Sequence, residues 1–184
     1  MKSTAGKLLV ANPNLRGSMF ERTIIYVIDH KPQGASGFIV NLSTGISLDT
    51  VGRHTGIEWP TPRELYRGGP VESSALYVLH SAEWYGSVNQ QAVGNDLCVS
   101  SDEIAFERLA MGDTPAYYKV LSGVCGWAPG QLDDEIEGTA SYSKGAGWLV
   151  MDYADRWVFN AEEQNRTWSL ALEAATSQAV QSFF

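Results

Sequence analysis

The sequence is poor in cysteine: only Cys98 and Cys125 occur among its 184 residues. They lie far apart and outside any CxxC spacing, which excludes a disulfide-dense scaffold and provides no zinc motif. Each lies in or beside an apolar stretch, where a free cysteine behaves as a small hydrophobic side chain. We therefore predict core positions for both, with a redox pair as the alternative.

Long hydrophobic runs are also missing from the chain. The longest apolar segments, such as Leu8–Ala11 and residues 37–40, are far too short to span a bilayer. Asn12, Pro13 and Arg16 interrupt the apolar core that an N-terminal signal peptide would need. These absences predict a cytoplasmic protein without membrane contact.

Basic residues are few. The chain holds 13 Lys and Arg against 21 Asp and Glu, a formal net charge of −8. Residues 93–184 carry five basic against fourteen acidic residues, whereas residues 1–92 carry eight against seven. Because non-specific affinity for nucleic acids comes mainly from neutralised phosphates, an acidic surface repels them. We predict that this chain does not bind nucleic acid directly.

Standard catalytic and cofactor motifs are absent from the sequence. No GxxxxGK[ST] phosphate loop occurs, and residues 34–37 lack the spacing of a GxSxG nucleophile elbow. Residues 145–147 begin like a dinucleotide fingerprint, but the third glycine is missing and an apolar strand follows. No metal-site spacing links the three histidines, His30, His54 and His80. We therefore expect no cofactor and no metal.

The chain does contain many short apolar segments separated by turns. Hydrophobic residues make up 44% of it, and 18 glycines and seven prolines are scattered between them, as tight turns require. The pattern predicts strands at residues 8–11, 22–29, 37–41, 65–67, 75–80, 96–99, 117–124 and 147–151, with a further short strand at 158–159. Because these strands come in adjacent pairs, we predict an α+β fold with a mainly antiparallel or mixed sheet, in a single domain over residues 1–184.

Helices are predicted at residues 48–54, 129–137 and 161–181, and a fourth follows Ser100. Ser100 and Glu103 match a capping box, in which the serine is the N-cap and the glutamate reaches back to its amide. This helix is expected to end at Gly112. In the terminal helix, a docking face is predicted from residues at helical spacing, namely Trp168, Leu172, Ala175 and Ala179.

Some polar and aromatic residues are candidates for function. His30 and His80 each close a predicted strand, where a side chain can reach a cleft or can simply bond a neighbouring loop. Trp127 stands between glycine-rich turns, where it either packs under the backbone or lines a pocket. An acidic cluster is suited either to acid–base chemistry or to a solvated helix start, and it consists of Asp133, Asp134, Glu135 and Glu137.

Several motifs follow one another in order along residues 7–150. They are Ala11-x-Pro13-x-Leu15, Phe20-Glu21-Arg22-Thr23, Asp29-His30, Gly34-Ala35-x-Gly37-Phe38-x-Val40-Asn41, Gly68-Gly69-Pro70-Val71, Leu79-His80-Ser81, and residues 126–132 followed by Glu135. In this order and at these spacings the chain resembles the AlgH/YqgE family of bacterial proteins. One departure is that Leu42 and Ser43 follow Asn41, where family members often have Lys-Pro.

The resemblance implies an α+β fold with a compact, partly barrel-like sheet flanked by helices. It also implies a cytoplasmic bacterial protein of a family commonly labelled as transcriptional regulators, without an agreed catalytic residue or cofactor. Because the acidic charge argues against direct DNA binding, we interpret a regulatory effect as indirect, through a protein partner or a small ligand.

Two functional hypotheses follow. The first is a non-enzymatic regulatory or interaction domain, whose recognition surface is built from Glu21, Arg22, His30, Asn41, Gly68, Gly69, Pro70, His80, Trp127, Gly130, Gln131 and Glu135. The alternative is an enzyme or small-molecule binder of unrecognised type, in which His30, His80 and Glu135 share a cleft. The oligomeric state stays open, because an edge strand or the terminal helix could serve an interface.

Overall fold

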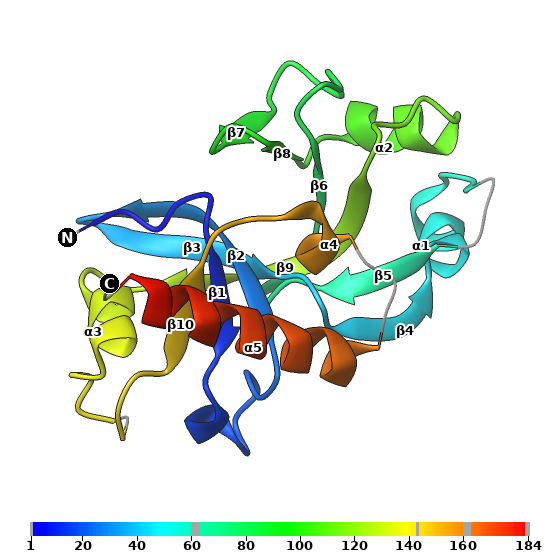
Figure 1. Ribbon diagram of the computed structural model, residues 1–184. Helices are drawn as coiled ribbons and strands as arrows, with labels where there is room; N and C mark the ends of the chain where they lie inside the picture. The colour runs from blue at the N-terminus through cyan, green and yellow to red at the C-terminus, as the bar shows by residue number, and fades with distance from the viewer. Residues whose placement is uncertain (1, 60–62, 143, 160–162, 183–184) are drawn as a thin grey trace.

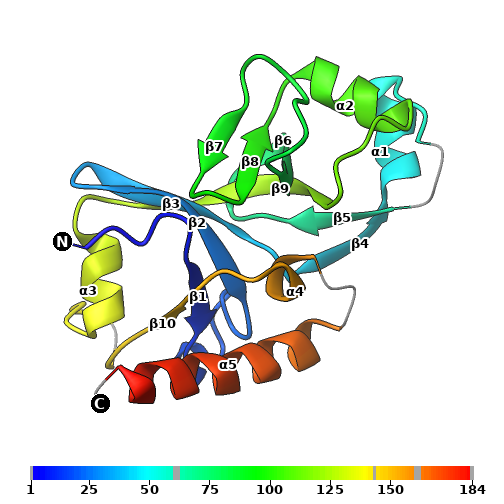
Figure 2. The same ribbon diagram turned by 45° about the horizontal axis from the view of Figure 1, so that its top comes forward.

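The computed structural model describes residues 2–59, 63–142, 144–159 and 163–182. Its strands are β1 (Leu8–Ala11), β2 (Ile24–Lys31), β3 (Gly34–Ile39), β4 (Ser43–Ser47), β5 (Glu64–Arg67), β6 (Val71–Ser81), β7 (Gln91–Val93), β8 (Leu97–Ser100), β9 (Tyr118–Trp127) and β10 (Trp148–Met151). Its helices are α1 (Leu48–Thr55), α2 (Glu103–Ala110), α3 (Gln131–Glu137), α4 (Asp155–Val158) and α5 (Gln164–Gln181), with a 3₁₀ turn at Pro13–Leu15. The strands form one curled sheet, seen from two sides in Figures 1 and 2.

The strand order is β10-β1-β2-β3-β9-β6-β8-β7, with β5 also paired to β9 and β4 paired to β5. The β5–β9 pair is parallel, and the other pairs are antiparallel. This architecture confirms the predicted α+β fold with a mainly antiparallel, partly barrel-like sheet flanked by helices.

Strand β9 joins the two halves of the sheet. Its residues 125–127 pair with β3, whereas residues 118–124 pair with β6. Gly123 lies between these stretches with φ at +72°, a conformation that glycine adopts without a steric penalty. The change of partner at this point gives the sheet its curl (Figure 2).

The segment Gly68-Gly69 crosses β9 where β3 and β9 separate. The Gly68 carbonyl accepts a hydrogen bond from the Ile39 amide at 2.8 Å. A Cβ atom on Gly68 would lie 2.3 Å from the Gly123 oxygen, and one on Gly69 would lie 2.2 Å from the Val124 carbonyl carbon. Both positions therefore require glycine because another backbone approaches them closely.

Strands β1 and β2 are apolar on both faces because both faces are covered. Leu8 and Val10 pack in a buried cluster with Ala171 of α5. Leu9 lies in a second cluster with Leu132 of α3. Alternate residues of one strand thus face two different helices, and Figure 2 shows α5 and α3 on either side of this part of the sheet.

Helices α1 and α2 cover the other half of the sheet through a third buried cluster. Leu48 of α1 and Phe106 of α2 pack there against Leu65 and Val120 of the sheet.

Within the described residues, no helix combines the length and the apolar character needed to cross a membrane.

The predicted cap of α2 is wrong. Asp102 is the N-cap, and its Oδ1 accepts a hydrogen bond from the Ala105 amide at 3.1 Å. Ser100 is instead the last residue of β8 and pairs with Val78 of β6. Its place in the sheet prevents it from capping the helix, which the local sequence pattern had predicted. The helix itself ends at Ala110, two residues before Gly112.

The predicted strand at residues 158–159 is also wrong, because Val158 is the last residue of helix α4. Helix α5 begins at Gln164, and the first predicted residues of the terminal helix, 161 and 162, lie outside the described residues. Ala175 is fully buried, and Trp168 and Leu172 pack against the core as the predicted docking face requires.

Candidate functional site

A pocket of about 560 Å³ opens on the face of the sheet that α3 covers. We call it the aromatic pocket. Its walls come from the loop at residues 14–20, the end of β9 at residues 125–127, and the segment from α3 through the following loop to the start of β10. Trp127 and Trp148 meet edge to face with ring centroids 6.4 Å apart, and Phe20 meets Trp148 in the same way at 5.7 Å.

The carboxylate of Glu135 is part of the lining of this pocket. Its Oε2 accepts hydrogen bonds from Nε1 of Trp127 at 3.0 Å and from Nε1 of Trp148 at 2.8 Å. Its Oε1 accepts from Nε2 of Gln131 at 3.0 Å and from the hydroxyl of Tyr142 at 2.6 Å. Each oxygen therefore has two donors, and a half-buried carboxylate is fully satisfied by side chains of the pocket wall.

These contacts fix the protonation states of the pocket. Burial alone would raise the pKa of the Glu135 carboxyl, but the hydrogen bonds that it accepts outweigh this and hold the pKa below its usual range. Burial raises the pKa of the Cys125 thiol to about 12. Burial and the bond to Glu135 also raise the pKa of the Tyr142 hydroxyl. At neutral pH the Cys125 thiol is therefore protonated, and the Glu135 carboxylate is ionised and bonded by the pocket wall.

Two loops are fastened together at the rim of the pocket. Nδ2 of Asn14 donates to the Lys144 carbonyl at 3.1 Å and to the Ala146 carbonyl at 2.8 Å. The amide of Gly147 donates to the Glu135 carbonyl at 2.7 Å. The loop before β2 and the loop before β10 are thus tied to each other and to α3, which holds the rim in one arrangement.

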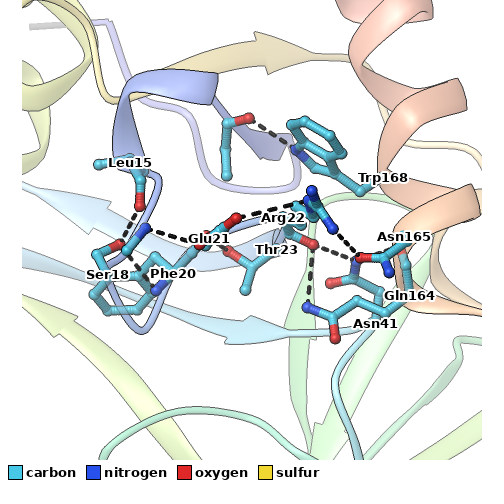
Figure 3. A network of polar contacts seen from close by, with 12 residues as sticks. Leu15, Ser18, Phe20, Glu21, Arg22, Thr23, Asn41, Gln164, Asn165 and Trp168 are labelled. Atoms are coloured by element: carbon cyan, nitrogen blue, oxygen red, sulfur yellow. Dashed lines mark hydrogen bonds and ion pairs between the residues drawn. The ribbon is translucent and has the colours of Figure 1, made fainter.

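A second set of predicted residues forms a polar corner between β2, β3 and α5, shown in Figure 3. Oδ1 of Asn41 accepts from the Ile24 amide at 2.8 Å, and its Nδ2 donates to the Arg22 carbonyl at 3.0 Å and the Gln164 carbonyl at 3.5 Å. Asn41 is 7% exposed. Its contacts with the backbone give it a scaffolding role in this corner.

Arg22 and Glu21 extend the same corner. Arg22 has φ at 57°, which costs a non-glycine residue free energy. Its guanidinium donates to Oδ1 of Asn165 at 3.1 Å and lies 5.9 Å from the ring centroid of Trp168. Glu21 accepts from the Gly17 amide at 2.7 Å. The corner therefore joins α5 to the loop that forms one wall of the aromatic pocket (Figure 3).

The structure does not assemble the predicted cleft of His30, His80 and Glu135. His80 is fully buried: Nε2 lies 3.0 Å from Oγ of Ser100, and the ring meets Trp84 edge to face at 4.9 Å. Burial lowers the pKa of His80. Since none of these neighbours contacts Glu135, the shared cleft is a wrong prediction.

His30 lies on another side of α3. Its Nδ1 is 2.9 Å from Oγ1 of Thr4, and its Nε2 is 3.6 Å from Oδ2 of Asp133. Thr4 and Asp133 also line a wider groove of about 810 Å³ between α3 and the end of α5. His30 is itself 5% exposed, so it supports the wall of this groove rather than the aromatic pocket.

Four predicted site residues do line the aromatic pocket: Pro70, Trp127, Gln131 and Glu135. Gly130 starts α3 with φ at +75°, and Gly68 and Gly69 serve close backbone approach. Sequence reasoning missed Arg16, Tyr142, Lys144 and Trp148, which also line the pocket. The turn cluster at residues 12–14 marked a loop near them, but it gave no sign of which distant loop it would contact.

Within the part of the chain that the structure describes, no group of three His, Cys, Asp or Glu residues is placed to hold a metal ion. The fold and the pocket together define an α+β domain with a curled sheet and a pocket lined by aromatic side chains. The chain belongs to the AlgH-like family, whose model matches residues 8–179.

Its relatives include UPF0301 proteins of Gluconobacter oxydans and Methylococcus capsulatus. The first is 38% identical over 92% of this chain and 89% of the relative, and the second is 35% identical over 94% and 91%. The fold is similar to the solution structure of the AlgH protein from Pseudomonas aeruginosa, with a TM-score of 0.71, 24% identity, and coverage of 94% of this chain and 92% of that one. A crystal structure of a Corynebacterium diphtheriae protein is also similar, with a TM-score of 0.69, 20% identity, and coverage of 93% and 86%.

Proposed function

We propose that this chain is a recognition domain without catalytic activity and that the aromatic pocket is its binding site. The observation that carries the proposal is the Glu135 carboxylate, whose two oxygens already accept four hydrogen bonds. A general base needs a lone pair directed at the substrate, and this carboxylate has its lone pairs directed at the pocket wall. The buried Cys125 thiol is protonated at neutral pH and is no nucleophile.

The shape and chemistry of the pocket support binding. A volume of about 560 Å³ falls within the range of ligand sites, which bury most of a small molecule against apolar walls. Trp127 is 8% exposed and Trp148 2%, so both rings are held rigidly and lose little conformational entropy when a ligand contacts them. The Glu135 bonds fix the orientation of both indoles.

A domain of this kind would exert a regulatory effect indirectly, in the cytoplasm, by binding a protein partner or a small ligand. The acidic charge supports an indirect route, since the chain carries a net charge of −8.

The test is retention of molecules from native bacterial lysate by three immobilised forms: wild type, Gly126→Leu and Gly126→Ala. Gly126 lines the pocket, and a Cβ atom there meets nothing within 4 Å, so the fold accommodates alanine, and urea unfolding of Gly126→Leu checks that the larger side chain leaves the stability in place. We expect a metabolite or protein that wild type and Gly126→Ala retain unaltered and that Gly126→Leu loses. Equal retention by all three forms, or chemical conversion of the retained molecule, would contradict the proposal.

A further inference from the structure

The charges around the aromatic pocket indicate what kind of ligand it takes. Among the described residues that line it, Glu135 is the acidic one and Arg16 and Lys144 are the basic ones. Glu135 is already bonded by four donors of the wall, so it does not call for a cationic ligand group. The four donors are neutral and leave the charge of Glu135 in place, so the charged side chains of the lining sum to +1.

Arg16 and Lys144 are both exposed, and neither forms an ion pair with a residue that the structure describes. Some other basic side chains do pair, since Lys31 lies 2.8 Å from Asp29 and Arg108 lies 2.5 Å from Asp113, whereas Arg53 on α1 forms no ion pair with a described residue either. In a chain with a net charge of −8, two cations without an acidic partner at one pocket form a local positive region.

The two cations are carried by loops that are fastened together. Asn14, two residues before Arg16, donates to the Lys144 carbonyl itself at 3.1 Å. The backbones that carry the two side chains are thereby held near each other before a ligand arrives. One anionic group at the rim can therefore be approached by both side chains.

We propose that the pocket binds a small free carboxylic acid with an apolar body. The body would lie against Trp127 and Trp148, and the carboxylate would lie at the rim between Arg16 and Lys144. This inference rests on the proposed function and adds the ligand class. The pocket volume of about 560 Å³ is typical of sites for small molecules. It is far too small to hold a folded protein partner.

The test compares 3-phenylpropionate with its neutral amide, which has the same apolar body without the charge. Binding is followed by the indole N–H signals of Trp127 and Trp148 in NMR spectra. We expect wild type to bind the acid about tenfold more tightly than the amide. The double variant Arg16→Gln/Lys144→Gln should reduce this ratio to about one, whereas Arg53→Gln, which removes an exposed cation on α1, should preserve it.

Three results would overturn the inference. Equal binding of acid and amide, both lost in Gly126→Leu, would reject the anionic ligand while the recognition pocket stands. Failure of both probes to shift either indole signal at millimolar concentration would reject this ligand class, and the lysate experiment would then decide separately on the proposed function. Binding of a peptide ending in a free phenylalanine carboxylate, without binding of the free acid, would assign the pocket to the C-terminus of a partner protein.

Discussion

At the scale of single residues, Glu135 organises the pocket by accepting four hydrogen bonds from Trp127, Trp148, Gln131 and Tyr142. Glu135→Gln replaces one acceptor oxygen by an amide donor that faces other donors. We expect the free energy of unfolding to fall by about 2 kcal/mol, because half-buried donors lose their partner. Urea unfolding measures this, with the exposed neighbour Glu137→Gln as the control. An unchanged stability of Glu135→Gln would contradict the central position of this carboxylate.

The same carboxylate gives a pH dependence. Its pKa in the folded chain lies below the ordinary value of 4.5, so its contribution to stability is present above that value and is lost as the pH falls through the folded pKa. We expect wild type to lose more stability on acidification than Glu135→Gln does. Acid unfolding curves that run parallel for the two proteins would contradict this.

Lys119 gives a pH dependence of the same sign at higher pH. Its Nζ is buried, donates to the Val40 and Val158 carbonyls at 2.6 Å each, and lies 3.9 Å from the Tyr66 ring centroid. Burial lowers its pKa from 10.5 to about 7. Between these values the unfolded chain binds more protons than the folded chain, so stability from this group rises with pH.

The substitution Lys119→Met removes this titration. The stability of wild type, measured relative to the variant, should therefore rise as the pH increases from about 7 toward 10.5. Urea unfolding at a series of pH values measures the difference. A difference that stays constant across this window would show that Lys119 keeps its ordinary pKa in the folded chain, and one that falls would show a raised pKa; either would contradict the lowered value.

At the scale of elements, β9 depends on the glycine crossing at its bend. A Cβ atom on Gly69 would lie 2.2 Å from the Val124 carbonyl carbon, so Gly69→Ala must displace one backbone. We expect a loss of about 2 kcal/mol or more in the free energy of unfolding. Gly126→Ala on the same strand enters open space and should cost less than about 1 kcal/mol. A similar loss in the free energy of unfolding for Gly69→Ala and Gly126→Ala would show that the close approach of Gly69 to β9 does not require glycine.

Some helices and strands could be predicted from the sequence, and others could not. The apolar runs in β1, β2 and β9 predicted strands because burial on both faces leaves a continuous signal. Strand β4 was missed because its residues are mostly exposed and polar, and α4 is a single turn that propensity does not mark. Trp127 and Glu135 were found through motifs. Arg16 and Lys144 were missed because they lie in loops. Long-range contacts bring these loops to the pocket, and such contacts leave no periodic pattern in the sequence.

At the scale of the whole molecule, the uneven charge predicts a lack of affinity for nucleic acids. Residues 93–184 carry fourteen acidic against five basic residues. We expect no binding of duplex DNA at an ionic strength of about 0.15 M, measured by fluorescence anisotropy. Binding whose affinity falls steeply as salt rises would contradict the proposal of an indirect regulatory effect, because such a slope reports phosphates neutralised by the protein.

We propose for the molecule as a whole that the aromatic pocket is a recognition site without catalytic activity. The most direct measurement follows the indole N–H signals of ¹⁵N-labelled protein while the small-molecule fraction of a bacterial extract is added. We expect the signals of Trp127 and Trp148 to shift, those of Trp84 and Trp157 to stay in place, and the bound compound to be recovered unchanged. Shifts confined to other tryptophans, or recovery of a chemically altered compound, would contradict it.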